Sequence, residues 1–267
     1  MNKTQLLPDR PGIPPMAKLP DPETVDPGEL LRAYESGEID LICVLGPTAS
    51  GKTRYAVELA RALGKAEILS ADSRQVYTGM DIGTGKDLGE YGDVPYHLID
   101  IVPAGTKFNI YQYQSAFADA WADVRRRGAV PILCGGSGLY IESATRAYKF
   151  EKDNGVPVSR LPQSVYYIGT LVSREERVAR IDRRLEERLK EGLVEEIRGL
   201  LESGIPADDL IYYGLEYKFV TQYVLGQLSY EDMVVALGNA IHQFAKRQMT
   251  WFRGMERDGV RIHWVRP

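Results

Sequence analysis

The sequence of 267 residues contains 44% hydrophobic and 26% charged residues, a composition typical of a soluble globular protein with one large core. Its formal net charge of −4 argues against a protein that coats nucleic acid indiscriminately, so any contact with RNA must come from a local basic patch. No hydrophobic run approaches the ~20 residues of a membrane-spanning helix, and the polar, proline-rich start does not resemble a signal peptide. We therefore expect a cytoplasmic protein without a membrane segment.

Residues 1–38 are expected to form an irregular N-terminal arm, because prolines recur too often for a helix or strand before Gly28. The stretch GELLRAYESGE, which begins there, is compatible with one short helix. The regular pattern of residues 39–267 begins with the buried strand LICVLG, followed by GPTASGKT at residues 46–53 and the amphipathic helix RYAVELARALG. A second strand, EILS, then ends in the polar stretch ADSRQVY.

The next segments continue this alternation with PYHLIDI, a helical stretch around NIYQYQSAFADAWADVRRRG, and the strand VPILC, which runs into GGSGLY. Strands and helices that alternate at this spacing predict an α/β fold with a mostly parallel sheet and helices on both faces. With GPTASGKT after the first strand, we expect a P-loop NTPase-like fold of nucleoside-kinase-like architecture. Cys43 and Cys134 each lie in one of the predicted strands, and we interpret them as small core residues. Such sheets bind ligands beyond the carboxyl ends of their strands.

The C-terminal part is expected to be mainly helical. A short polar connector at residues 151–165 leads into one more hydrophobic run, VYYIGTLV. The spacing of hydrophobic residues predicts one long helix over residues 174–204 and a last amphipathic helix over residues 238–257.

The segment GPTASGKT matches the pattern G-x-x-x-x-G-K-[ST] in the required context, between a hydrophobic strand and a helix. Its glycines allow the backbone to turn tightly and to aim several N–H groups at phosphate oxygens. Lys52 adds a positive charge, and the Thr53 hydroxyl can hold Mg²⁺. The residues predicted to bind a diphosphate are Gly46, Thr48, Ala49, Ser50, Gly51, Lys52 and Thr53.

Asp72 stands just beyond the second strand, at the carboxyl edge of the predicted sheet. A carboxylate there can accept a proton from an attacking amine or hydroxyl, which is the work of a general base. The alternative is that Asp72 or Ser73 caps a turn or a helix. Several P-loop kinases would place an acid similarly, so Asp72 alone does not separate phosphoryl transfer from other chemistry.

Two groups of basic residues each have two interpretations. Arginines 177, 180, 184 and 188 fall on one stripe of the long helix, where a diphosphate would compensate their repulsion; the alternative is a solvated face with Glu176–Arg180 and Arg183–Glu187 pairs. The stretch AKRQMTWFR at residues 245–253 suits a helix that meets nucleic-acid phosphates with one face. The alternative is an amphipathic helix that only packs on the sheet.

Four stretches, namely GPTASGKT, SADSRQVYTGMDIGTGK at residues 70–86, GGSGLY and AKRQMTWFR, resemble in order and spacing the tRNA dimethylallyltransferase (isopentenyl transferase) family. The resemblance implies that the phosphate loop binds dimethylallyl diphosphate, whose diphosphate is the leaving group when adenine N6 attacks the allylic carbon. It implies that Mg²⁺ is held through Thr53. Asp72 matches the acid that takes the N6 proton, and Arg184 matches an arginine that contacts the diphosphate.

The resemblance also assigns an acceptor side, where Ser137 replaces the usual threonine. The residues assigned to adenosine or tRNA binding are Ser73, Gln75, Tyr77, Ser137, Lys246, Arg247 and Arg253.

Three departures from the family pattern fall on the RNA side. A helical insertion that grips the anticodon stem in the family is replaced by the short connector. The usual G-Y-[KR] segment reads Gly214-Leu215-Glu216, which loses a basic contact and adds an acid, and the usual Thr-Arg before AKRQ reads Ile241-His242. Prenyl transfer is therefore better supported than the identity of the acceptor.

We expect dimethylallyl transfer to N6 of adenine, with an adenosine near the anticodon of tRNA as acceptor. The first alternative is the same transfer to a free adenine nucleotide, as in cytokinin-forming relatives. The remaining alternatives are a P-loop kinase that phosphorylates a small molecule and a catalytically silent RNA-binding protein.

Overall fold

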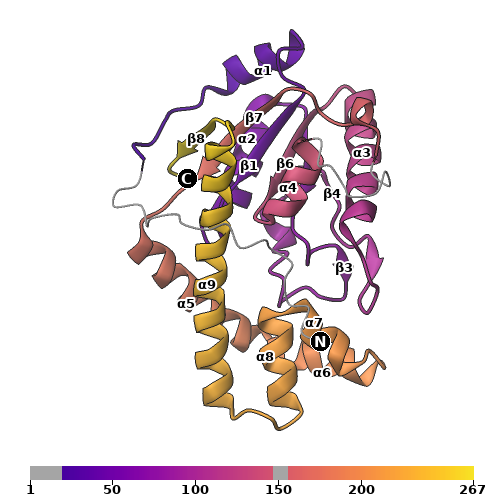
Figure 1. The fold of residues 1–267 in the computed structure, drawn as a ribbon, viewed down its shortest axis with the longest axis vertical. Coiled ribbons are helices and arrows are strands. Elements are labelled where there is room, and N and C mark those ends of the chain that lie inside the picture. Colours follow the sequence, from indigo (N-terminus) through magenta and orange to yellow (C-terminus); the bar gives the residue numbers. More distant parts are fainter. Residues whose placement is uncertain (1–19, 147–155) are drawn as a thin grey trace.

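Short hydrophobic segments build a six-stranded sheet in the computed structural model, which describes residues 20–146 and 156–267 (Figure 1). The strand order is β4 (Tyr96–His97), β2 (Ala66–Ser70), β6 (Val130–Gly135), β1 (Leu41–Leu45), β7 (Val165–Thr170) and β8 (Ile262–Val265), with all pairings parallel. Strands β1, β2 and β6 are buried along their whole length, as central parallel strands covered on both faces should be. A separate two-stranded pair consists of β3 (Tyr77–Thr78) and β5 (Val102–Pro103).

The side chains of β1 alternate between two hydrophobic cores, one on each face of the sheet. Leu41, Cys43 and Leu45 belong to the core that also contains residues of α3 (Ile110–Arg126) and α4 (Gly138–Thr145). Ile42 and Val44 belong to the core shared with α1 (Pro27–Glu35) and α2 (Lys52–Leu63). The predicted α/β fold with helices on both faces is confirmed.

The helix expected within the N-terminal arm is present as α1. The Asp26 side chain caps it by accepting a 2.7 Å hydrogen bond from the Gly28 N–H. Just before the helix, the Glu23 N–H donates to the Trp264 carbonyl, so this segment lies against β8 at the edge of the sheet. Residues 1–19 of the predicted arm and residues 151–155 of the predicted connector lie outside the described residues. The described part of the connector includes the short 3₁₀ helix Val158–Arg160.

The prediction of one long helix over residues 174–204 is wrong. The structure has α5 (Arg174–Glu191) and α6 (Leu193–Glu202), separated at Gly192. Gly192 has φ 107°, a left-handed conformation that ends α5 and that glycine adopts without strain. The hydrophobic spacing continues across this break, which is why the pattern alone did not reveal it.

The last helix begins earlier than predicted, since α9 spans Tyr230–Arg257. The Ser229 side chain caps it by accepting a hydrogen bond from the Asp232 N–H, and Met233 and Leu237 of its first turns are buried. Two short helices, α7 (Ala207–Tyr213) and α8 (Leu215–Val224), precede it and were not predicted. None of the helices in the described residues combines the length and hydrophobicity needed to cross a membrane.

The paired registers bring three loops together at the carboxyl edge of the sheet. Leu45 of β1 lies opposite Gly135 of β6, and Ser70 of β2 lies opposite Cys134. The segments that follow these strands therefore leave the sheet side by side. Helices α5 and α9 pack against each other, and the long α9 runs from β8 to the helices α6–α8 at the far end of the molecule (Figure 1).

Candidate active site

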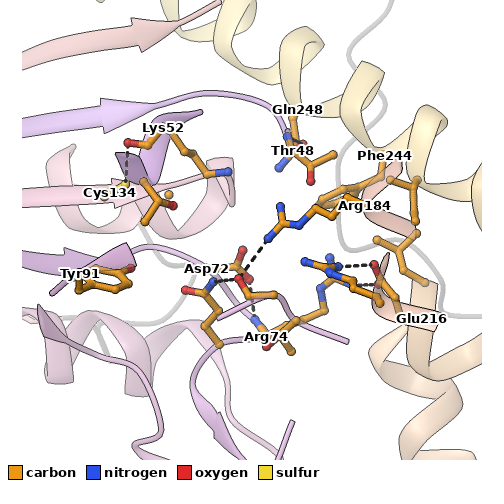
Figure 2. A pocket seen from close by; sticks show the side chains of 18 residues that line it. Thr48, Lys52, Asp72, Arg74, Tyr91, Cys134, Arg184, Glu216, Phe244 and Gln248 are labelled. Atoms are coloured by element: carbon orange, nitrogen blue, oxygen red, sulfur yellow. Dashed lines mark hydrogen bonds and ion pairs between the residues drawn. The ribbon is translucent and has the colours of Figure 1, made fainter. Parts of the chain in front are cut away.

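A cleft opens at this carboxyl edge, between the sheet and the C-terminal helices, with about 640 Å³ of empty space that is continuous with solvent (Figure 2). Its walls are formed by Thr48, Lys52, Thr53, Asp72, Arg74, Gln75, Thr84, Gly85, Tyr91, Cys134, Gly135, Arg184, Arg188, Leu215, Glu216, Ile241, Phe244 and Gln248.

The phosphate loop, residues 46–53, is fixed by contacts to two neighbouring elements. The Ser50 hydroxyl of the loop forms a buried 2.7 Å hydrogen bond with the hydroxyl of Thr170, the last residue of β7. The Thr48 N–H donates to Gln248 Oε1 of α9 at 2.8 Å, so this amide has a protein partner. Helix α2 starts at Lys52, and the N–H groups of a first helical turn have no partner within the helix. The loop therefore carries the geometry of an anion site.

Within this loop, the side chains of Thr48, Lys52 and Thr53 line the cleft. The other predicted diphosphate residues, Gly46, Ala49, Ser50 and Gly51, are not among the residues that line it. Burial lowers the pKa of Lys52 below its usual value, while the nearby Asp72 carboxylate acts in the opposite direction.

Asp72 caps a turn and also lies in the cleft, so both interpretations made from the sequence are compatible with its position. Its Oδ1 accepts a 3.0 Å hydrogen bond from the Arg74 N–H two residues later, which is the turn cap. The same side chain lines the cleft together with Lys52 and Arg184 (Figure 2). The cap orients the carboxylate and does not remove it from the cleft.

The predicted row of arginines is divided between two environments. Arg184 and Arg188 line the cleft, where Arg184 forms an ion pair with Asp87 and donates to the Gly85 carbonyl at 3.3 Å. Arg180, on the same stripe, pairs with Glu176 and also donates to the Ala49 carbonyl of the phosphate loop at 3.5 Å. The solvated-face alternative holds for Arg183, which is exposed and pairs with Glu187. Arg177 is not among the residues that line the cleft.

Gly85 allows the two cleft arginines to lie against the loop of residues 81–87. A Cβ atom at this position would stand 1.6 Å from Arg188 Nη2 and 2.4 Å from Arg184 Nη2. Its φ of +59° is in addition a left-handed conformation. Burial lowers the pKa of Arg188 to about 10, and the charge of Arg184 acts in the same direction.

The residues predicted to contact the acceptor from the first three motifs lie in three different places. Gln75 lines the cleft and donates to the Gly85 carbonyl at 3.2 Å. Ser73 and Ser137 contact each other, since the Ser73 N–H donates to the Ser137 hydroxyl at 3.0 Å, but neither is among the residues that line the cleft.

Tyr77 is 5% exposed and packs on Tyr213 with ring centroids 4.6 Å apart, so its side chain lies in the core. Burial raises the pKa of Tyr77 to about 12. This placement gives no support to the predicted adenosine contact of Tyr77.

The basic stretch at residues 245–253 forms part of α9 and has two faces. Trp251 and Phe252 are buried in the core, while Lys246 and Arg247 are exposed. Arg253 is half-buried outside the cleft, and burial lowers its pKa. The packing alternative therefore applies to the inner face, and the exposed pair remains available to a partner.

Several side chains of the cleft were not assigned a role from the sequence, among them Arg74, Glu216, Phe244 and Gln248. Arg74 and Glu216 form a 2.7 Å ion pair, and the Arg74 guanidinium lies over the Phe244 ring at 5.4 Å. Gln248 also donates to the Gly136 carbonyl at 2.9 Å and so joins the phosphate loop to the GGSGLY segment. Arg74 and Gln248 lie inside the motifs SADSRQVYTGMDIGTGK and AKRQMTWFR, which was a usable signal, whereas no motif contained Phe244.

A smaller space of about 280 Å³ adjoins the cleft between α5 and α9. The residues that it shares with the cleft are Thr48, Arg184, Arg188, Glu216 and Ile241. Its remaining walls are hydrophobic, from Ala49, Ile181 and Leu185. Charged and hydrophobic surfaces therefore meet at one place, as a ligand with a charged head and a hydrocarbon tail requires.

Comparisons with known proteins agree with this arrangement. The family model described as IPP transferase matches residues 75–163 and 149–255, and a model described as isopentenyl transferase matches residues 39–91. The two segments of the first match meet in the interval of the short connector.

Individual relatives extend the match. A protein of Porphyromonas gingivalis named tRNA dimethylallyltransferase 1 is 47% identical, over 84% of this chain and 93% of the relative. The solved structure of the full-length tRNA isopentenylpyrophosphate transferase from Bacillus halodurans superimposes with a TM-score of 0.75 at 28% identity, covering 85% of this chain and 89% of that one. The corresponding enzyme of Staphylococcus epidermidis gives a TM-score of 0.73 at 31% identity, covering 85% and 92%. This chain belongs to the tRNA dimethylallyltransferase (IPP transferase) family.

Proposed function

We propose that the protein transfers a dimethylallyl group from dimethylallyl diphosphate to N6 of an adenosine near the anticodon of tRNA, releasing diphosphate. The observation that carries this proposal is the meeting of Lys52, Arg184 and Asp72 in one cleft. Two cations suit the diphosphate, and a carboxylate beside them suits an amine that must lose a proton.

On the donor side, Lys52, Arg184 and the first-turn amides of α2 hold the diphosphate. The C–O bond to the leaving group breaks, and these groups stabilise the negative charge that develops on its oxygens. The hydrophobic walls formed by Ile181, Leu185 and Ile241 suit the dimethylallyl group and keep water from the reacting carbon.

Thr53 is the residue that would hold Mg²⁺. Its side chain lines the cleft beside Lys52, and the described residues contain no cluster of three or more His, Cys, Asp or Glu side chains that could bind a metal alone. A hydroxyl completed by diphosphate oxygens and water fits the preference of Mg²⁺ for oxygen ligands. Bound there, the ion would neutralise charge on the leaving group.

On the acceptor side, the adenine leaves its stack in the RNA so that N6 can reach the cleft. A bond forms between N6 and the allylic carbon, and Asp72 takes the proton from nitrogen. The Arg74 N–H holds one carboxylate oxygen in place for this role. Gln75 lines the same wall, and the exposed Lys246 and Arg247 supply basic groups for the RNA backbone.

The test is the release of pyrophosphate from dimethylallyl diphosphate with Mg²⁺ and either unmodified tRNA or AMP as acceptor. We expect release that requires tRNA, with a dimethylallyl group found by mass on an adenosine of the recovered RNA. Release with AMP alone would replace the proposal by transfer to free nucleotides. ADP formed from ATP and a small molecule, without prenyl donor, would replace it by a kinase activity.

A further inference from the structure

A buried carboxylate lies on the wall of the cleft at a position where the family pattern has a basic residue. Glu216, at the start of α8, is 3% exposed. Its Oε2 accepts a hydrogen bond from Arg74 Nη1 at 2.7 Å, and its Oε1 accepts one from Arg188 Nη1 at 3.2 Å (Figure 2). One acid therefore engages two of the cationic side chains of the cleft.

This contact decides which charges the cleft offers to a ligand. The cations that line it are Lys52, Arg74, Arg184 and Arg188. The Arg74 and Arg188 side chains are only 16% and 11% exposed, so solvent screens their pairing with Glu216 poorly. Removing one partner of such a buried group leaves uncompensated charge behind. Without Glu216, two guanidiniums would face the cleft with no acid between them.

The freed guanidiniums would have a natural ligand in a phosphate monoester. A guanidinium binds two phosphate oxygens at once, and a nucleotide 5′-phosphate carries close to two negative charges. Arg74 lies on the acceptor side, because its own N–H contacts Asp72. An adenosine within an RNA strand has no terminal phosphate to place there, and its phosphodiesters can remain at the exposed Lys246 and Arg247.

We propose that Glu216 is a specificity-determining residue, which keeps the 5′-phosphate of free adenine nucleotides from binding Arg74 and Arg188 and so reserves the cleft for adenosine within RNA. The inference rests on the proposed function, since it assumes that the acceptor is an adenine. Repulsion by the carboxylate and occupation of both guanidiniums act in the same direction.

Both arginines have a second anchor that would keep them in place after the acid is replaced. The Arg74 guanidinium lies 5.4 Å from the centre of the Phe244 ring, a cation–π contact. Arg188 also donates to the Gly83 carbonyl at 3.4 Å. A substitution at Glu216 should therefore change the charge of the cleft more than its shape.

The experiment measures the dissociation constant of AMP by calorimetry, without donor or tRNA, for the native protein and the Glu216→Gln variant. We expect Glu216→Gln to bind AMP about tenfold more tightly or better, the gain of one charged hydrogen bond, with adenosine binding unchanged. Glu216→Asp should stay near the native value, and so should Glu186→Gln, a control on the exposed face of α5. Unchanged or weaker AMP binding in Glu216→Gln overturns the proposal.

A second variant serves if Glu216→Gln alone does not fold, which thermal unfolding reveals. Glu216→Gln combined with Arg188→Gln keeps the native net charge and still leaves Arg74 unpaired, so AMP should again bind more tightly; unchanged binding contradicts the proposal. These measurements involve no turnover. If the native protein fails to prenylate tRNA, the proposed function is refuted. The effect of Glu216 on AMP binding can still be measured, so the two failures can be distinguished.

Discussion

The two walls of the cleft are built in different ways. The sheet wall comes from short segments that directly follow strands, so Lys52 and Asp72 are placed by the backbone of their own motifs. The helical wall comes from single side chains of α5, α8 and α9, among them Arg184, Glu216 and Gln248. Chemistry that depends on backbone geometry is thus local in the sequence, whereas the charge balance of the site depends on distant residues.

The walls are joined through the loop of residues 81–87. The Glu196 carboxylate of α6 accepts hydrogen bonds from the N–H groups of Asp81, Ile82 and Gly83, at 2.8, 2.7 and 3.1 Å. The Gly85 carbonyl of the same loop accepts from Gln75 of the sheet wall and from Arg184 of the helical wall. Because the walls carry different groups, we expect a change at Asp72 of the sheet wall to affect the rate of transfer, and a change at Arg184 of the helical wall to affect donor binding as well.

Replacing the base on the sheet wall should have the largest effect. Asp72→Asn keeps an oxygen that can accept the Arg74 N–H but cannot take a proton, so kcat should fall by about 10²–10⁴-fold. The dissociation constant of inorganic pyrophosphate should stay nearly native. Single-turnover assays with tRNA and calorimetry with pyrophosphate measure the two quantities. Turnover at the native rate would remove Asp72 from the mechanism.

On the helical wall, Arg184→Gln should lower kcat/KM for dimethylallyl diphosphate by about 10²-fold, since it removes one charged donor to the leaving group. Pyrophosphate binding should weaken in parallel, in contrast to Asp72→Asn. The matched control is Arg183→Gln on the same helix, whose side chain is 70% exposed and only pairs with Glu187. Equal loss in both variants would show that the helix surface, and not the cleft position, matters.

The joint between the walls can be tested by Gly85→Ala. The new Cβ would meet Arg184 and Arg188 in a left-handed backbone conformation, so the free energy of unfolding should fall by about 1–3 kcal/mol. Chemical unfolding in urea measures this loss. Gly89→Ala is the control, because a Cβ there would have no heavy atom of the described residues within 4 Å. A similar loss in both variants would contradict the assigned role of Gly85.

Glu67, at the amino end of β2 and away from the cleft, should affect the stability of the fold but not activity, and the effect should be small. The pKa of Glu67 is held below its usual value by hydrogen bonds from Arg127, which outweigh burial, and by a hydrogen bond with His97. Because the folded pKa is the lower one, this stabilisation is present above the unfolded pKa and lost as pH falls through the folded pKa. Glu67→Gln should lower the Tm by a few degrees at pH 7 and less at pH 3.

Activity of Glu67→Gln at neutral pH should remain native, which distinguishes this edge from the cleft. A Tm difference that grows as the pH falls would mean that the ionised carboxylate does not stabilise the fold.

The sequence was a good guide wherever a motif controls its own geometry. The phosphate loop, Asp72 and the central strands lie where their patterns predict, because strand periodicity and loop chemistry act over a few residues. It was a poor guide where long-range packing decides. Tyr77 lies in a motif but packs on Tyr213, and the hydrophobic spacing across Gly192 hid a helix end. Glu216 was visible only as an unexpected acid; its two arginine partners come from α5 and from the loop after β2.

The proposed reaction requires that the phosphate loop binds a leaving diphosphate while Asp72 faces the attacked carbon. A crystal structure with an unreactive analogue of dimethylallyl diphosphate and Mg²⁺ would show both features. We expect a diphosphate on Lys52 and Arg184 with the allylic carbon directed toward Asp72. A diphosphate bound elsewhere, or an allylic carbon turned away from Asp72, would contradict it.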